Sequence, residues 1–293
     1  MVKDRSFSSK ALDVVTHSVM VAVVLVTLLP FVHIVAISFS GPKDVVAGNV
    51  FLWPVNFDLV AYKLIFSNFL IPKSFVNSVI ITVLGTAINM AVTVITAYPL
   101  AKSTLPFRSF FLKMFLLTMF FSGGLVPKFL LVNSLGMYDS FWALTVPLAI
   151  NTYFLIIMLS FFKNFPREIE ESAKMDGCNE LQVLLRIVLP LSMASVMTIG
   201  LFYAVQHWNS YFQALLYINS NDKYPLQLIL RQIVLQSQVQ NLMQGTPVDY
   251  QTQVNSESLK YGTLVISIVP MLVLYPFVQK YFVRGVMIGS LKG

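Results

Sequence analysis

The sequence predicts an all-α membrane protein with six transmembrane helices. Of its 293 residues, 56% are hydrophobic and only 11% are charged, with a mean hydropathy of +0.74. Soluble domains have roughly a quarter of their residues charged. Six apolar runs each reach the roughly 20 residues that a helix needs to cross a bilayer. No stretch between the runs is long enough for a water-soluble domain, so we expect one membrane domain over residues 1–293.

The apolar runs also predict a topology. Six spans place both termini on one side of the membrane, and thirteen of the twenty lysines and arginines lie in the connections of that side or in the adjoining ends of the runs. The positive-inside rule therefore puts both termini in the cytoplasm, and it explains the net charge of +7 without a nucleic-acid partner. The first run is too long for the apolar core of a secretory signal. The runs cover residues 14–39, 75–98, 110–132, 141–162, 191–218 and 261–282.

The cytoplasmic connection 163–190 is predicted to fold into two short helices with a corner between them. It carries a charge at nearly every second or third position, which excludes it from lipid. Acidic residues after Pro166 favour a helix start, and Gly177 is a natural stop. Asn179 then caps a second helix, with Gln182 three residues later as in a capping box. Such a corner is suited to transmitting movement; an ordinary folded loop is the alternative.

The expected outer side holds two long loops, 41–73 and 219–260. Within the second, residues 226–242 alternate polar and apolar side chains at helical spacing, which predicts a surface helix. This helix is either a solvated cover for the bundle or a contact for an extracytoplasmic partner. Helix breakers interrupt several spans, as transporters tolerate where a cavity or neighbours satisfy the backbone, although packing kinks are the alternative. They are Ser122, Gly123, Gly124 and Pro127 in the third span, Pro147 in the fourth, and Pro270 and Pro276 in the sixth.

The fifth run contains AVQHWNSYFQALLYI, the most polar intramembrane stretch of the chain. Four of its polar residues recur three or four positions apart, so a continuous helix would place them on one face. Amides and hydroxyls suit sugar hydroxyls, and aromatic rings suit the apolar side of a sugar. Contacts between helices and an interfacial aromatic belt are the alternatives. The expected substrate-path residues are Gln206, Trp208, Asn209, Tyr211, Gln213 and Tyr217.

Several kinds of chemistry lack their residues. No Asp or Glu lies inside any of the six runs, which disfavours proton or cation coupling. The chain has three histidines, one cysteine and no His-Glu-x-x-His motif, and it has no Gly-x-x-x-x-Gly-Lys-[Ser/Thr] phosphate loop. We therefore expect neither an enzyme nor a metal site, and any ATP that powers the protein is used by another polypeptide.

The corner also carries a family motif. Glu171-Ser172-Ala173, then Gly177, Ile187 and Leu189-Pro190 resemble the EAA motif of the permease subunits of bacterial ABC importers, with Ser172 in place of the usual alanine. Trp208-Asn209, Tyr224-Pro225-Leu226 and the ending from Tyr281 to Gly293 are similar to the carbohydrate-uptake branch of that family. That branch includes the smaller maltose permease subunit and permeases for alginate.

The resemblance implies a type I ABC importer permease fold in the bacterial cytoplasmic membrane. It implies a second, different permease subunit, two cytoplasmic ATPase subunits that hold ATP and magnesium, and an extracytoplasmic sugar-binding protein; this chain itself would hold no cofactor. Oligosaccharides, uronates among them, would be the cargo, with another solute, or an ion-coupled or passive six-span carrier, as the alternatives. The loop 219–260 would reach into the binding protein, and the tail 285–293 would touch the ATPases. The implied ATPase-coupling residues are Glu168, Glu170, Glu171, Ser172, Ala173, Asp176, Gly177, Ile187, Leu189 and Pro190.

Overall fold

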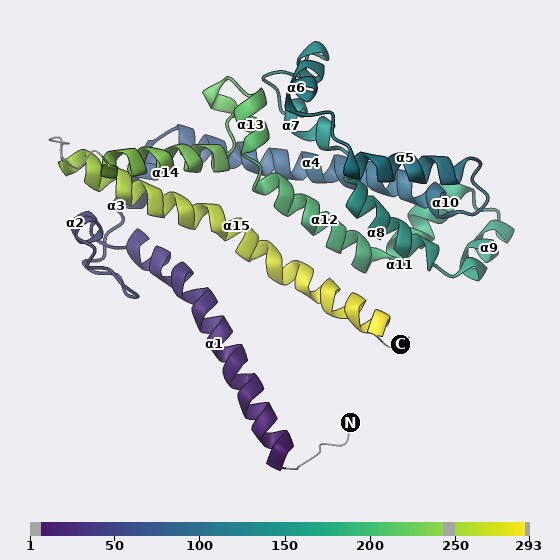
Figure 1. Ribbon diagram of the computed structural model, residues 1–293, viewed down its shortest axis with the longest axis horizontal. Coiled ribbons are helices and arrows are strands. Elements are labelled where there is room, and N and C mark those ends of the chain that lie inside the picture. Colours follow the sequence, from purple (N-terminus) through teal and green to yellow (C-terminus); the bar gives the residue numbers. More distant parts are fainter. Residues whose placement is uncertain (1–6, 243–249, 291–293) are drawn as a thin grey trace. The chain divides into compact units, whose positions relative to one another are not determined.

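The computed structural model describes residues 7–242 and 250–290, and their regular structure is helical throughout (Figure 1). The chain divides into two compact units, Met1–Phe69 with Gln232–Ser267 and Leu70–Arg231 with Ile268–Gly293. Helices α14 (Leu226–Leu242) and α15 (Tyr250–Ser290) each contribute to both units. The helix expected at residues 226–242 is thus confirmed, but it is not a surface helix throughout, because Leu226 and Leu228 in its first turn are buried. Part of that loop, residues 243–249, and the side chains of the tail 285–293 lie outside the described residues.

The first unit is built around the end of α1 (Phe7–Ser38), together with α2 (Pro42–Val46) and α3 (Val60–Ser67). Most of α1 exposes apolar side chains, as expected of a helix that meets lipid. Its last turn packs against Val50, and α15 approaches α3 so closely that a Cβ on Gly262 would lie 2.8 Å from the Ile65 side chain. A larger residue at this position would force the Ile65 side chain to move.

The second unit is centred on α4 (Leu70–Ala101), which packs along α8 (Thr152–Lys163) and α12 (Met193–Trp208) (Figure 1). Apolar side chains from all three helices form its core, and Met158 of α8 and Tyr203 of α12 are fully buried. This shared core holds the three helices together as one block, because separating them would expose its side chains to water at about 0.8 kcal/mol for each methylene group.

Within residues 7–242 and 250–290, three helices are long and apolar enough to cross a membrane alone, and three bent pairs bring the possible number of spans to six. The helices α5 (Arg108–Phe120) and α6 (Leu125–Ser134) meet at 116°. The turns α7 (Trp142–Thr145) and η1 (Val146–Leu148) meet α8 at 51°, and the stretch Glu180–Leu191 meets α12 at 85°. The single spans are Ala11–Ser38, Leu70–Ala101 and Ser256–Pro276.

The third span breaks at residues 121–124, where Ser122, Gly123 and Gly124 lie. The fourth breaks at residues 149–151, just after the short helix η1 that contains Pro147. Around the second break, side chains satisfy the backbone groups that the missing helical turn frees. The Asn89 amide donates to the carbonyl of Leu148, and the Asn151 backbone N–H donates to the Tyr203 hydroxyl at 3.1 Å. Tyr203 in turn pairs with Thr93 at 2.8 Å. In contrast, α15 continues as a helix through Pro270 and Pro276.

The prediction of one continuous helix over the fifth run was wrong. The helix α12 ends at Trp208, and a new helix, α13, begins only at Phe212 (Phe212–Tyr217). The N–H groups of Asn209 and Ser210 bond to the carbonyls of Val205 and His207 and close the last turn of α12. The polar residues before and after this break therefore do not share one helical face.

A hydrogen-bonded carboxylate fixes the connection after α13. Asp139 accepts bonds from the N–H groups of Asn219 and Ser220 at 2.9 Å each, and from Lys223 Nζ at 2.9 Å. The Ser220 hydroxyl also donates to this carboxylate. Its bond is the largest cause, and the others add to it, in holding the pKa of Asp139 well below its ordinary value. Leu226 N–H also donates to Ser78 Oγ at 2.8 Å, so the start of α14 is attached to α4.

Candidate functional site

The corner in the connection 163–190 is built as its sequence predicts. Helix α9 spans Arg167–Met175 and ends in a Schellman motif, with Gly177 at φ +87°. Gly177 N–H donates to the Lys174 carbonyl and Cys178 N–H donates to the Ala173 carbonyl, each at 3.0 Å. A residue with a side chain would be strained at this φ, so glycine is needed to turn the chain.

A capping box starts the second helix of the corner. The Asn179 side chain accepts from Gln182 N–H, and the Gln182 side chain accepts from Asn179 N–H, both at 2.9 Å. The chain continues through α10 (Glu180–Val183), a π-helical turn η2 (Leu184–Val188) and α11 (Leu189–Leu191). Because Pro190 has no N–H to donate to the preceding turn, the wider π-helical turn is accommodated here.

Buried apolar side chains attach this corner to the transmembrane block. Ala173 of α9 and Val183 of α10 lie in the same core as Tyr98 of α4 and Phe162 of α8. Val183 and Val188 are fully buried, and Ala173 is 6% exposed. Since protein cores are close-packed, the corner and the ends of α4 and α8 have to move together.

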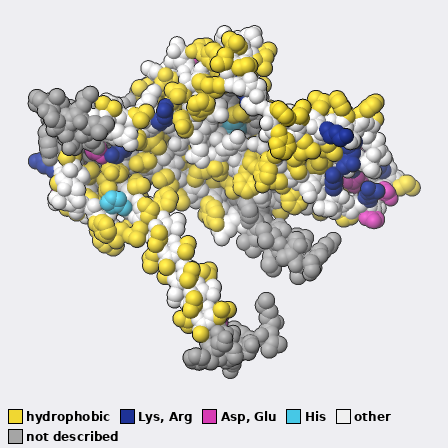
Figure 2. Space-filling model, viewed as in Figure 1, with side chains coloured by type: hydrophobic (Ala, Val, Ile, Leu, Met, Phe, Trp, Pro, Cys, Tyr) yellow, Lys and Arg dark blue, Asp and Glu magenta, His cyan; other side chains and the backbone are white. Residues whose placement is uncertain are grey.

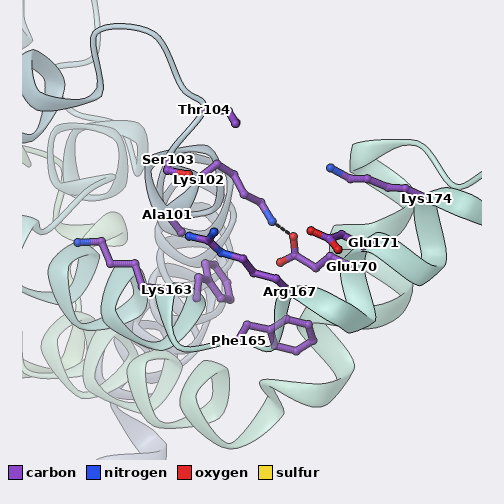
Figure 3. A pocket seen from close by; sticks show the side chains of 11 residues that line it. Ala101, Lys102, Ser103, Thr104, Lys163, Phe165, Arg167, Glu170, Glu171 and Lys174 are labelled. Carbon is purple, nitrogen blue, oxygen red and sulfur yellow. Dashed lines mark hydrogen bonds and ion pairs between the residues drawn. The ribbon is translucent and has the colours of Figure 1, made fainter.

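An ionic network reinforces the same attachment (Figure 3). Lys102, just after α4, forms an ion pair with Glu170 of α9, and its ammonium group lies 4.3 Å from the centre of the Tyr98 ring. The Tyr98 hydroxyl donates to Glu180 at 3.1 Å, and Lys174 donates to the other oxygen of that carboxylate. The hydrogen bond from Lys174 lowers the pKa of Glu180 and raises that of Lys174.

Charged side chains gather at this end of the second unit (Figure 2). They surround a hollow of about 180 Å³ beneath α9, which Figure 3 shows from close by. Lys163 and Arg167 also line it, along with the turn that follows α4. Among the described residues, no three His, Cys, Asp or Glu side chains gather where they could hold a metal ion.

The fifth-run candidates are divided between the core and the surface. Trp208 is 2% exposed and meets the edge of Phe75, and Tyr217 is 5% exposed and stacks on Phe129. Gln213 is partly buried and accepts from the Ser210 hydroxyl. Of the six, the exposed ones are Gln206, Asn209 and Tyr211. The sequence analysis missed Arg231, whose guanidinium carbon lies 5.2 Å from the centre of the Tyr211 ring.

Comparison with known protein families gives the family of this chain. The sequence model of the family described as binding-protein-dependent transport system inner membrane component matches residues 103–288, well over half of the chain. The chain belongs to this family. It is thus an ABC transporter permease of the carbohydrate-uptake type, a multi-pass inner membrane protein and a transport component rather than an enzyme. Binding-protein dependence sets aside the ion-coupled or passive carrier.

Full-length relatives support this membership. The polygalacturonan/rhamnogalacturonan transport system permease protein YtcP of Bacillus subtilis (strain 168) is 42% identical over 290 residues, which cover 97% of this chain and 99% of that protein. Protein LplC of the same organism is 44% identical over 272 residues, 92% and 90% of the two chains. A solved structure, of a bacterial ABC transporter involved in the import of the acidic polysaccharide alginate, matches with a TM-score of 0.86 and 30% identity over 96% of this chain and 100% of that one.

In this permease the motif residues lie on two sides of the corner. Glu170 and Ala173 point into the protein, and Ile187 and Leu189 pack partly against its core. The exposed motif residues are Glu168, Glu171, Ser172, Asp176, Gly177 and Pro190. Three apolar residues beside them are also exposed, Met175 by 88%, Leu181 by 61% and Leu185 by 54%. The sequence analysis did not single out these three, although apolar side chains on a water-facing corner indicate a contact surface.

Proposed function

We propose that this permease forms half of the translocation path of an ATP-driven importer of uronate oligosaccharides. A second, different permease subunit forms the other half, and two cytoplasmic ATPase subunits and an extracytoplasmic binding protein complete the assembly. One observation carries the proposal: the full-length relative YtcP and the alginate importer are both named for polysaccharides built from uronic acids. The absence of Asp and Glu from the six apolar runs suits a path for anions, because carboxylates along it would repel the cargo.

The corner is the part that couples the permease to an ATPase. Its exposed face combines Glu168 and Glu171 with the apolar side chains of Met175, Leu181 and Leu185, a mixture typical of a partner surface. Its inner face is joined to α4 and α8 through Ala173 and the Lys102–Glu170 pair. When an ATPase displaces α9, the transmembrane block therefore moves with it, because α9 is packed directly on α4 and α8 and no flexible linker separates them.

The movement reaches the breaks in the spans at the other end of the block. Helices α5, α8 and α12 have 13, 12 and 16 residues, so at 1.5 Å per residue they are about 18–24 Å long. Each has one end on the side of the corner and the other end at a break. The hydrocarbon core is about 30 Å thick, which puts the breaks in its outer half. Unwound backbone at this depth is typical of transporters, where it faces a cavity and binds cargo.

ATP hydrolysis by the complete complex tests this function. The permease, its companion permease, the ATPase and the binding protein are reconstituted in nanodiscs, and hydrolysis is measured with neutral and with uronate oligosaccharides of equal length. We expect stimulation by the uronates together with the binding protein. Stimulation by neutral sugars alone would contradict the proposed cargo, and full activity without a binding protein would contradict coupling through the outer face.

A further inference from the structure

A hollow of about 510 Å³ lies between the broken third and fourth spans, within the second unit. The break at residues 121–124 forms one wall, and the break before α8 forms the other. The hydroxyls of Thr118 and Thr152 lie 3.0 Å apart and join the two walls. Sites for small molecules have about 300–1,000 Å³, so a sugar unit fits this hollow.

The lining of the hollow is suited to an anion. It includes one lysine, Lys128 on α6, and neither Asp nor Glu. The hydroxyls of Ser122 and Thr152 and the NH₂ group of Asn151 also line it, and they can donate to the hydroxyls of a sugar. The oxygen of the Asn151 amide already accepts from two backbone N–H groups at the start of α8. The ring of Tyr153 is 58% exposed and offers an aromatic face beside them.

Two helices also begin at this hollow. Both α6, with 10 residues, and α8, with 12, start directly after the breaks that line it. The N-terminal end of a helix carries a partial positive charge of about half a unit, which attracts anions. The start of α8 is already capped, since the Asn151 side chain accepts from the N–H groups of Tyr153 and Phe154. The start of α6 has no side-chain cap, so it and Lys128 favour the same kind of ligand.

Lys128 is an unusual residue at its position. It belongs to the apolar run 110–132 and is exposed on α6, and charged side chains inside such runs are rare and commonly mark a transport pathway. No ion pair among the residues that the structure describes includes Lys128. The wall opposite it is held in place by Asn89 and Tyr203, which bond to Leu148 and Asn151 at the break. The hollow is thus formed before any ligand arrives.

We propose that this hollow is a subsite of the transport path for the carboxylate-bearing unit of the cargo. Lys128 pairs with the carboxylate, the hydroxyl and amide groups of the walls bind the sugar hydroxyls, and Tyr153 lies against the ring. This inference rests on the proposed function, since it names the group that selects uronates over neutral sugars.

Uptake into proteoliposomes that contain the complete complex tests the inference. The variants are Lys128→Gln, Lys128→Arg and the matched control Lys113→Gln, which removes an exposed lysine of α5 that does not line the hollow. Each is given a uronate oligosaccharide and the neutral sugar obtained by reducing its carboxyls. Copurification with the ATPase shows that each variant assembles.

We expect Lys128→Gln to lower uronate uptake about tenfold at sub-saturating sugar, the factor that corresponds to 1.4 kcal/mol. Uptake of the neutral sugar should not fall, and Lys128→Arg and Lys113→Gln should keep most of the uronate uptake. Wild-type uptake of uronates with an unchanged rate in Lys128→Gln would overturn this inference alone. Wild-type uptake of the neutral sugar only would overturn the proposed function and the inference together.

Discussion

Replacing Gly177 by alanine changes the backbone of the corner between α9 and α10 without adding a steric clash. Gly177 has φ +87°, and a Cβ placed on it would meet no heavy atom within 4 Å. An L-residue in this left-handed region costs roughly 1–2 kcal/mol. A loss of that size changes the ratio of the formed to the unformed corner by a factor of about 5–30.

The functional consequence follows from the bonds that the corner loses. When Gly177 leaves its left-handed conformation, its bond to Lys174 and the bond from Cys178 to Ala173 open together. Helix α9 then no longer moves as one body with α10, which follows the turn. We expect Gly177→Ala to lower the sugar taken up per ATP hydrolysed several-fold, measured in proteoliposomes that contain the complete complex.

Gly136→Ala is the matched control. Gly136 has φ +69°, and a Cβ placed on it would likewise meet no heavy atom within 4 Å, so alanine has a similar backbone cost there. It lies in the turn after α6, far along the chain from the corner. Both variants should lower the melting temperature of the complex similarly, and only Gly177→Ala should uncouple it. Equal uptake per ATP in the two variants would refute the reasoning.

Three further substitutions have expected outcomes. Lys102→Met leaves the carboxylate of Glu170 buried without its partner, and we expect a loss of about 3 kcal/mol in the free energy of unfolding, measured by denaturant titration. Gly85→Ala places a Cβ 2.5 Å from the His207 ring and forces α4 and α12 apart, so the melting temperature should fall by the equivalent of about 1–3 kcal/mol. Asp139→Asn removes a carboxylate whose lowered pKa stabilises the fold above about pH 4, a contribution that is lost as the pH falls through that lowered pKa. The variant should be less stable than the wild type at pH 7 by about 2 kcal/mol, and the difference should shrink in acid.

Each of these substitutions has its own control. The double variant Lys102→Met with Glu170→Met should recover much of the stability, since no charge stays buried; no recovery would contradict the ion pair as the cause. Gly200→Ala adds a methyl group to α12 with its nearest contact at 3.8 Å and should be tolerated. A stability difference for Asp139→Asn that does not depend on pH would mean that the charge is not the source.

The local features of the corner could be predicted because their causes are close together in the sequence. A glycine stop and a capping box each involve residues within about five positions of one another, and both are present at Gly177 and at Asn179 with Gln182. The breaks in the third and fourth spans were marked in the same way by glycine and proline. No comparable signal precedes Tyr211, so the end of α12 could not be predicted from the local sequence.

The orientation of individual side chains depended on distant residues. The inward orientation of the Glu170 side chain could not be predicted from the sequence, because its partner Lys102 lies 68 positions away. Trp208 looked like a stacking surface for sugars, but it is buried against Phe75 of another helix. The hollow beside Lys128 likewise forms only when two broken spans come together.

Accumulation of a labelled uronate oligosaccharide by proteoliposomes tests the central claim most directly. The vesicles contain the complete complex with ATP on the side of the ATPase and the binding protein on the other side. We predict accumulation against the concentration gradient that requires both ATP and the binding protein, and that is lost in Gly177→Ala. Entry that stops at the outside concentration, or that continues without ATP, would contradict this claim.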